Sequence, residues 1–216
     1  MFSAFDSIVS SYHELAATVL LTLHMEARCQ IIHSLSIALS SESAPYLLEQ
    51  AVDDPDPRIL SLNADLVSYD ETIVRFLRDR EISFVRSGLG LLMDSFLVTN
   101  AGMVKAMNAN GCGRMQLNIL VLQQNLKNIE ADVTLERAAR FFDIFSEGPE
   151  AAVKQAKEGK DNTNGGKEMF SYDELKTLIE LCYSEQLSSP ERGISTVAKR
   201  GMADHVLQLS EFMWQS

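Results

Sequence analysis

Histidine and cysteine are the residue types of this chain that would bind a transition metal. His13, His24 and His33 follow one another at intervals of eleven and nine residues. Cys29 lies between the last two, and His205 is isolated. A zinc site on a helix uses histidines four residues apart, as in H-E-x-x-H, and no two of these histidines have that spacing. We therefore expect surface or partly buried histidines and no metal site.

A second candidate is a polar segment that begins at Asp161 and superficially resembles a calcium loop entering a helix. Counting from Asp161 places Gly166 correctly at position 6, but position 12 is Tyr172. Counting back from Glu174 places Glu168 where glycine is required. A calcium loop needs several carboxylates and a bidentate acid at its end. The register therefore predicts a flexible loop and no calcium site.

Nucleophilic and phosphate chemistry have little support in the sequence. Thr196 and Lys199 have the spacing of a Ser-Lys pair, but threonine stands at the nucleophile position, and no G-x-S-x-G motif occurs. Gly88-Leu89-Gly90 and Gly111-Cys112-Gly113 lack the full phosphate-binding pattern and follow no expected strand. We expect no catalytic residue, no cofactor-binding or metal-binding residue, no cofactor and no enzyme activity. The sequence does not place the residues of a protein interface.

The charge of the chain argues against some partners. Its formal net charge is −11, which disfavours a nucleic-acid surface and direct docking on anionic lipid. A modest basic cluster without interleaved aromatic residues does not change this expectation; it consists of Lys154, Lys157, Lys160 and Lys167. Residues 1–60 hold eight acids against Arg28 and Arg58. This acidic stretch is either a solvated surface or a face for a basic protein partner.

Cysteine usage and hydropathy indicate the compartment. Cys29, Cys112 and Cys182 are odd in number, far apart and in apolar contexts, which is typical of reduced, packed thiols. Met1–Ser10 lacks the basic segment of a signal peptide. The longest apolar run, Leu15–Leu23, is less than half of a bilayer span. We expect a cytoplasmic, soluble chain with no direct membrane insertion.

Apolar periodicity and turn residues predict helices throughout and no strand. The expected helices span residues 5–39, 58–80, 82–107, 114–129, 134–145, 149–157, 171–184 and 190–213. Prolines end the first helix in a loop at 40–57, and a glycine-rich loop at 159–167, extending to about 168, is expected to be flexible. The chain is therefore expected to be all-α, an elongated up-and-down helical bundle that forms a single domain over residues 1–216.

Local signals mark two helix starts, and apolar residues mark the helix faces. Ser171 and Glu174 have capping-box spacing, and Ser189 followed by Pro190 is typical of a helix start. In the first helix the apolar residues that follow helical steps are Tyr12, Ala16, Val19, Leu23, Ala27, Ile31 and Leu35. The second is expected to bury Ile59, Leu62, Leu66, Ile73, Phe76 and Leu77.

The helix over 114–129 has the best apolar pattern in the chain. One face carries Met115, Ile119, Leu122, Leu126 and Ile129, and a second face carries Leu117, Leu120 and Val121. A helix that is apolar on two sides is usually buried between neighbours, so we expect burial on both. Three glycines lie in the expected helix 82–107, where each costs roughly 1 kcal/mol relative to alanine; they are Gly88, Gly90 and Gly102. They favour the close approach of a neighbouring helix.

Four segments, read together, resemble one known family. They are the runs LAATVLLTLHMEAR at 15–28, LNADL at 62–66, GLGLL at 88–92 and NILVLQQNLKNI at 118–129. In this order and spacing they resemble the C-terminal region of exocyst complex component four, the Sec8 subunit family, over about residues 8–145. The glycine-rich loop at 159–167 has no counterpart in that pattern.

The resemblance implies a helical rod without catalytic residues, in which this chain is the C-terminal part of a longer subunit. Subunits of that kind belong to an eight-subunit assembly that tethers secretory vesicles to the plasma membrane before fusion. The implied partners are the other exocyst subunits and, through the complex, small GTPases or the fusion machinery. The implied location is cytoplasmic, peripheral at sites of secretion on the plasma membrane.

Other interpretations share the expected fold. A helical adaptor or small-GTPase effector scaffold unrelated to the exocyst would show the same helices. An all-α metal-dependent hydrolase would need convergent histidine and aspartate ligands, which the pattern lacks. The aromatic residues near the ends, Phe2, Phe5, Phe212 and Trp214, are either sticky ends of a fragment or anchors for a neighbour.

Overall fold

The computed structural model describes residues 2–40, 46–130, 132–161 and 170–214. These parts of the chain form α-helices and one 3₁₀ turn, with no strand among them. The elements are α1 (Phe2–Leu39), α2 (Pro57–Val74), α3 (Asp79–Arg86), α4 (Leu89–Thr99), η1 (Ala101–Met103), α5 (Ala109–Leu126), α6 (Glu136–Glu147), α7 (Pro149–Asp161), α8 (Tyr172–Leu187) and α9 (Arg192–Trp214). The prediction of an all-α bundle is confirmed.

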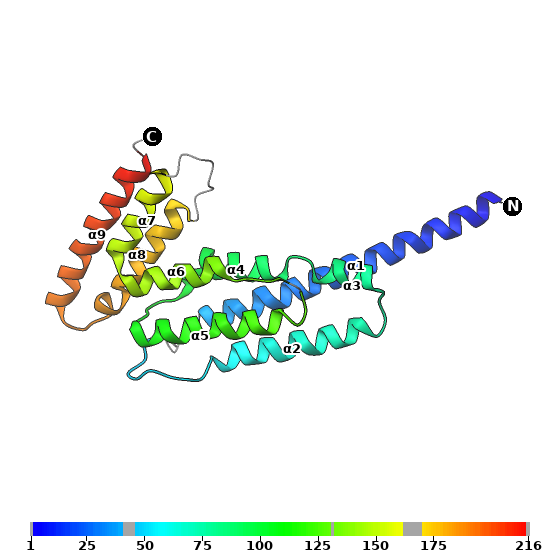
Figure 1. Cartoon of the computed structure of the whole chain (residues 1–216), viewed down its shortest axis with the longest axis horizontal. Coiled ribbons are helices and arrows are strands. Elements are labelled where there is room, and N and C mark those ends of the chain that lie inside the picture. The colour runs from blue at the N-terminus through cyan, green and yellow to red at the C-terminus, as the bar shows by residue number, and fades with distance from the viewer. Residues whose placement is uncertain (1, 41–45, 131, 162–169, 215–216) are drawn as a thin grey trace.

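The helices lie in two groups joined by α6 (Figure 1). In the first group, α1 packs against α2, α3 and α4, while α5 packs against α2 and α4. In the second group, α7, α8 and α9 pack on one another, and α6 contacts α4 and α5 as well as α7 and α8. The first half of α1 runs beyond the other helices of the first group, so the molecule is elongated, with its N-terminus at the far end of this projection (Figure 1).

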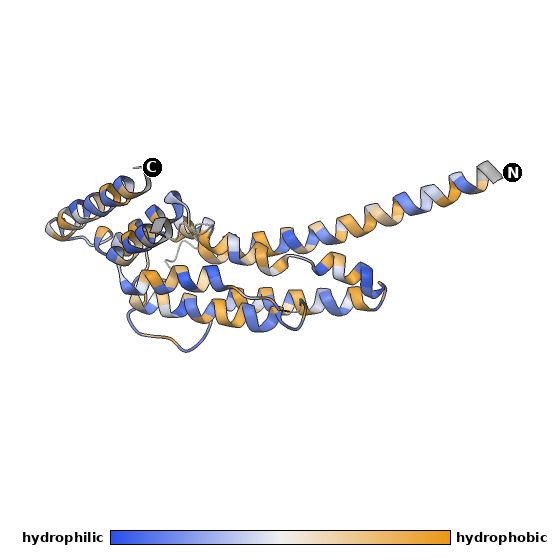
Figure 2. Ribbon diagram, turned by 45° about the horizontal axis from the view of Figure 1, so that its top comes forward, coloured by the Kyte–Doolittle hydropathy of each residue, from blue (hydrophilic) through white to orange (hydrophobic). Residues whose placement is uncertain are grey.

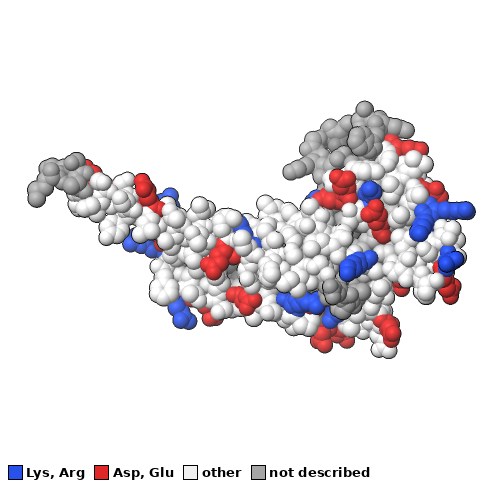
Figure 3. Space-filling view, turned by 180° about the vertical axis from the view of Figure 1, so that it is seen from behind, with Lys and Arg blue, Asp and Glu red and all other residues white. Residues whose placement is uncertain are grey.

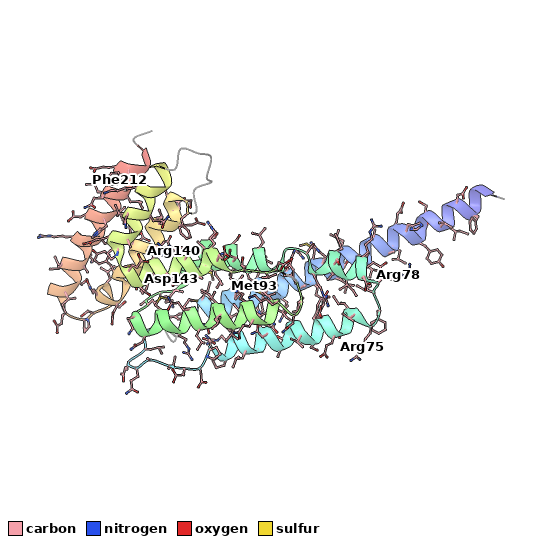
Figure 4. The ribbon with its side chains drawn as sticks, viewed as in Figure 1. Arg75, Arg78, Met93, Arg140, Asp143 and Phe212 are labelled. Carbon is pink, nitrogen blue, oxygen red and sulfur yellow. The ribbon has the colours of Figure 1, made fainter. Side chains whose placement is uncertain are left out.

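A continuous cluster of buried apolar side chains extends from Ala27 of α1 to Leu209 of α9. Met93 of α4 lies inside the first group (Figure 4) and is fully buried. Phe141 and Phe142 of α6 are also fully buried, and their rings meet edge to face with centroids 5.2 Å apart. Edge-to-face contact is a favoured geometry for aromatic pairs. The core therefore runs through α6 from one group of helices to the other.

Capping residues set several helix starts. Asp56 accepts a hydrogen bond from the backbone N–H of Arg58 (2.8 Å) and precedes Pro57, the first residue of α2. The predicted capping box at the start of α8 is confirmed, since Ser171 and Glu174 each accept from the other's backbone N–H. The last helix begins at Arg192, two residues later than the Ser189 cap predicts.

The expected continuous helix over 82–107 is wrong. The chain forms α3, α4 and η1 instead, and residues 104–108 are not helical. The break between α3 and α4 occurs at Gly88, whose φ of 77° lies in the left-handed region that glycine adopts without strain. The second helix also ends at Val74 instead of residue 80, and Phe76 is 80% exposed where burial was expected.

The start of α5 also differs from the prediction. Asn108 caps α5 by accepting from the backbone N–H of Gly111 (2.9 Å), so both glycines of the 108–113 stretch lie inside the helix. Gly111 is required there because a Cβ at this position would lie 1.7 Å from the carbonyl oxygen of Tyr46. The loop after α1 packs directly on the helix backbone at this point.

Only one face of α5 is fully buried. The predicted residues Met115, Ile119, Leu122, Leu126 and Ile129 are all in the core. On the second face Leu120 is 50% exposed, so the expected burial of both faces is wrong. The close approach expected at Gly90 is present, but it comes from the side chain of Val133, in the connection between α5 and α6, and not from a helix.

Candidate interaction surface

Buried polar side chains in the middle of two helices bond to the backbone at or just before the start of two others. Asp94 of α4 is 8% exposed and accepts from the backbone N–H of Ala138 near the start of α6 (2.7 Å). Burial raises the pKa of Asp94, and the backbone N–H bonds to its carboxyl group oppose that shift. Asn118 of α5 accepts from the backbone N–H of Asp56 (2.8 Å), just before α2. These polar groups have structural partners, so they are not available for catalysis.

Sequence reasoning missed these buried polar residues. Asp94 lies within the apolar run LGLLMDSFLVT, and Asn118 lies within the apolar pattern of α5. A single polar residue inside such a run is a signal of a buried hydrogen bond. That signal identifies the residue but not its partner, because Asn118 and Asp56 are far apart in sequence.

The glycine pair at 88 and 90 binds an anion, but the anion belongs to the chain itself. The backbone N–H groups of Gly88 and Gly90 donate to the two carboxylate oxygens of Glu130, at 2.7 and 3.1 Å. Arg28 of α1 donates to the carbonyl oxygen of Ser87 beside them. The N-terminal end of α4, which is the positive end of the helix dipole, is therefore neutralised by the Glu130 carboxylate. This carboxylate occupies the position in which a helix N-terminus can bind a phosphate.

Among the described residues, the histidines and cysteines are not grouped into a metal-binding site. Within the described ranges no three or more His, Cys, Asp or Glu side chains are grouped to hold a metal ion. His24 stacks on Phe84 with ring centroids 4.7 Å apart, and its Nδ1 lies 2.9 Å from the Phe84 carbonyl oxygen. His205 Nδ1 lies 3.0 Å from the Tyr183 hydroxyl. Cys29 is exposed.

Of the two other thiols, that of Cys112 is in the core and that of Cys182 is partly buried against it. Cys112 of α5 is buried and contacts the Phe142 carbonyl oxygen at 3.3 Å. Burial raises the pKa of Cys112 to about 11 and that of Cys182 to about 12. At neutral pH both are protonated, so neither has the thiolate that a nucleophile or metal ligand requires.

The other candidates from the sequence are engaged or lie outside the described residues. Most of the calcium-like segment, 162–169, is outside the described residues. Glu174, near its end, pairs with Arg137 (2.6 Å). Burial alone would raise the pKa of Glu174, but the Ser171 backbone N–H and Arg137 hold it below its usual value. Thr196 donates its hydroxyl to the Arg192 carbonyl oxygen (2.8 Å), which is an ordinary helix contact.

Of the basic cluster, Lys157 lies over the Phe212 ring, with Nζ 4.1 Å from the centroid. This is cation–π distance, and Phe212 is packed against the core. The side chains of Lys160 and Lys167 lie outside the described part of the chain. The aromatic residues near the two ends of the chain differ in burial. Phe212 packs within the fold, whereas Phe5 is 65% exposed.

The feature that stands out from the rest of the surface is the projecting first half of α1. We call residues 5–21 the α1 arm. Every side chain of residues 5–19 is exposed. The large apolar side chains of the arm are Phe5 (65% exposed), Ile8 (56%), Val9 (36%), Tyr12 (69%), Leu15 (60%), Val19 (48%) and Leu21 (54%). Contiguous exposed apolar patches mark protein or membrane interaction sites, so the arm is the candidate interaction surface of the chain.

The figures show the same feature. Hydrophobic residues recur along the arm in Figure 2, and in Figure 3 the arm stands clear of the bundle with most of its described surface neither acidic nor basic. A hollow of about 320 Å³ lies at its base, where α1 meets the start of α3. It is lined by Tyr12, Leu15, Ala16, Val19, Leu20, Leu77 and Glu81. The arm and this hollow form one apolar surface.

Two stretches are long and apolar enough to cross a membrane by length and composition alone, residues 5–39 and 79–99. The second is broken at Gly88 and supplies core residues such as Met93 and Leu97. The first buries Ala27 and later residues inside the bundle. The second stretch is therefore a helical part of the bundle, whereas most of the apolar window in the first stretch is exposed on the α1 arm.

Comparison with known proteins gives the family. No family profile matches the chain. The probable exocyst complex component sec8 of Neurospora crassa is 54% identical over 98% of this chain and 22% of its own length. Exocyst complex component 4 of Homo sapiens is 32% identical over 65% of this chain and 15% of its own length, and that of Dictyostelium discoideum is 27% identical over 89% and 16%.

The matched region contains the four segments whose resemblance carried the sequence interpretation, since nearly the whole chain aligns with the Neurospora protein. The chain spans about a fifth or less of the length of these relatives. All three relatives, from a fungus, an amoeba and an animal, are named as exocyst complex components, sec8 in the fungus and component 4 in the other two. The chain belongs to the exocyst complex component 4 family, known in fungi as Sec8.

Proposed function

We propose that this chain is a non-catalytic segment of an exocyst subunit and acts in exocytosis, where the complex tethers secretory vesicles to the plasma membrane before fusion. The family supports the assembly, because the relatives are named as exocyst components. The observation that supports action through protein contacts is the exposed apolar surface of the α1 arm. An exposed apolar helix face costs solubility unless a protein surface covers it.

The architecture fits a structural part. Long helices packed side by side make a stiff body, and the buried cluster from Ala27 to Leu209 joins its two groups. We propose that residues 1–216 form one helical-bundle domain, the C-terminal part of a longer subunit. Its contacts act through buried apolar anchors surrounded by polar residues, as protein interfaces generally do.

The partners follow from this role. The other exocyst subunits contact the parent protein directly, and small GTPases or the fusion machinery are reached through the complex. The location is cytoplasmic, peripheral at sites of secretion on the plasma membrane. The net charge of −11 supports protein partners over an anionic lipid surface.

Affinity purification of the tagged parent protein, with and without this segment, tests the proposal. Partners are identified and quantified by mass spectrometry. We expect the remaining exocyst subunits with the intact parent, and loss of at least one subunit on deletion of the segment. Copurification of another set of proteins would instead support a helical adaptor unrelated to the exocyst.

A further inference from the structure

The connection between α8 and α9 carries the one serine–proline pair of the chain. Of the five prolines, only Pro190 directly follows a serine or threonine, namely Ser189. Arg192 stands three positions after that serine, so the segment has the pattern Ser-Pro-x-Arg. The sequence pattern favours a helix start at Ser189, but α9 begins only at Arg192. The serine–proline pair therefore lies in the connection and not in the helix.

This connection is accessible from solvent. Residues 188–191 are not helical and lie at the end of the molecule opposite to the N-terminus (Figure 1). Pro190, Glu191 and Arg192 are exposed, and Ser189 is half-buried. The residue before a proline is biased toward extended backbone, which is the conformation in which protein kinases bind a substrate peptide. Both the position and the backbone of Ser189 therefore suit modification by a kinase.

The first turns of α9 pack weakly, so they can open to join the extended segment. The first buried residue of this helix is Ala198. No described atom lies within 4 Å of a Cβ added at Gly193, and Ile194 is 43% exposed. Helix ends with few buried contacts open locally at small cost in free energy. A kinase can therefore bind Ser189 and Arg192 within one extended peptide.

The spacing of these residues fits a proline-directed serine/threonine kinase. In such an enzyme the backbone N–H after the serine would find no acceptor, so proline, which has no N–H, is favoured there. A basic residue three positions after the serine pairs with acidic groups of the kinase. In the transfer, the Ser189 Oγ bonds to the γ-phosphorus of ATP, the bond from that phosphorus to the β,γ-bridging oxygen breaks, and ADP leaves. The hydroxyl proton passes to the catalytic aspartate of the kinase.

The surroundings of Ser189 indicate where its phosphate would lie. The Ser189 Oγ already accepts a hydrogen bond from the backbone N–H of Glu191 (3.3 Å). On its other side is a hollow of about 600 Å³, whose described lining residues include Glu49 and Glu185 and no lysine or arginine. A phosphate carries about −1.5 to −2 charges at pH 7, so these two carboxylates repel it. The positive N-terminal end of α9 and the Arg192 guanidinium attract it.

We propose that Ser189 is a phosphorylation site for a proline-directed serine/threonine kinase that recognises Pro190 and Arg192. The phosphate accepts hydrogen bonds from backbone N–H groups at the start of α9 and pairs with Arg192, so the modification orders the first turns of this helix. The unmodified chain has a weakly packed α9 start, and the modified chain has a capped one. The site does not depend on the exocyst assignment, because every residue that forms it lies in this chain.

Phosphate transfer from ATP by a cyclin-dependent kinase with its cyclin tests the site on the 216-residue chain. Mass spectrometry should locate the phosphate on Ser189, and Ser189→Ala should abolish its incorporation. Ser188→Ala is the matched control, because Ser188 is an exposed neighbour that no proline follows, and it should leave the transfer unchanged. Pro190→Ala and Arg192→Ala should each lower kcat/KM by roughly tenfold or more. Equal incorporation by the native chain and Ser189→Ala would overturn the proposal.

The parent protein purified from its own cells, with phosphatases inhibited, tests whether the site is used. We expect a phosphopeptide that carries phosphoserine at Ser189. Its absence from both dividing and arrested cells would overturn the proposal.

Hydrogen exchange tests the ordering of α9 in the 216-residue chain before and after phosphorylation by the same kinase. We expect the amides of residues 191–196 to exchange about threefold or more slowly in the phosphorylated chain, because the phosphate caps the start of the helix. The difference should shrink in 1 M salt, which screens exposed charges. Unchanged or faster exchange after phosphorylation would refute the capping role.

Discussion

The contact between Gly111 of α5 and the loop after α1 leads to a prediction with a matched control in the same helix. The backbone N–H of Asn108 donates to the Tyr46 carbonyl oxygen (3.1 Å), and the Asn108 side chain donates to the Leu48 carbonyl oxygen (2.9 Å). Tyr46 itself is 1% exposed. The backbone of this loop therefore lies against α5 at Gly111, which has no side chain to block the contact.

Gly111→Ala is expected to lower the free energy of unfolding. The added Cβ would lie 1.7 Å from the Tyr46 carbonyl oxygen and 2.5 Å from its carbonyl carbon. Overpacking of this kind costs about 1–3 kcal/mol where the backbone shifts. If the loop instead moves away and takes the Tyr46 ring out of the core, the loss is about 3–5 kcal/mol. Alanine returns about 1 kcal/mol of helix propensity. We expect a net loss of about 2 kcal/mol or more.

Gly113→Ala is the control. It lies two residues along the same helix and has no atom within 4 Å of the added Cβ. Its helix propensity gain of up to about 1 kcal/mol is therefore unopposed. Urea unfolding followed by far-ultraviolet circular dichroism measures both variants. We expect them to differ by about 3 kcal/mol, with opposite signs relative to the native chain.

A double-mutant cycle locates the effect. In a Tyr46→Ala background the loop has lost its buried anchor, so Gly111→Ala should cost much less than in the native chain. Equal free energies of unfolding for Gly111→Ala and Gly113→Ala would refute the reasoning. So would a full cost of Gly111→Ala in the Tyr46→Ala background.

Two further predictions concern titratable groups. At pH 8 the native chain should react with a thiol reagent quickly at the exposed Cys29 only, because Cys112 is buried, Cys182 is partly buried, and their pKa values are raised to about 11 and 12. Mass spectrometry counts the modified thiols, and two or more fast thiols would contradict the fold. The raised pKa of Asp94 means that its ionised form is less favourable in the folded chain than in the unfolded one. Its ionisation therefore removes stability as pH rises from the unfolded-state value of about 4 through the higher folded-state value. Asp94→Asn abolishes this loss, so the free energy of unfolding of the variant relative to the native chain should improve between pH 3 and pH 7. A difference that is constant with pH would show that Asp94 does not titrate as described.

The helices were predictable from the sequence where apolar residues follow one helix face and a local cap marks the start. The pattern from Met115 to Ile129 placed the buried face of α5, and Ser171 with Glu174 placed the start of α8. These signals are local: they depend on residues within a few turns of each other. The all-α fold follows from them without any tertiary information.

The breaks inside helices were not predictable in this way, because distant residues cause them. Gly88 adopts its left-handed conformation beside Glu130, which binds the start of α4 from the far end of α5. Gly111 stays inside α5 because Tyr46 packs against it. Glycine at a helix start and glycine at a helix break look alike in a single sequence.

The α1 arm was predicted as an apolar helix face, but its exposure was not. Tyr12 and Val19 belong to the same series of three- and four-residue steps as Ile31 and Leu35, and the series alone does not separate the exposed pair from the buried pair. Periodicity shows that a face packs against something. It does not show whether the cover lies in the same 216 residues, so only the structure separates the two halves of α1.

The most direct test of the central claim is crosslinking mass spectrometry on the assembled complex purified from its own cells. The exposed Lys105, Lys127 and Lys199 report on three separate parts of this segment. A segment that works through protein contacts should give reproducible crosslinks from at least one of these lysines to another exocyst subunit. A complex in which all of them crosslink only within their own polypeptide would contradict the claim.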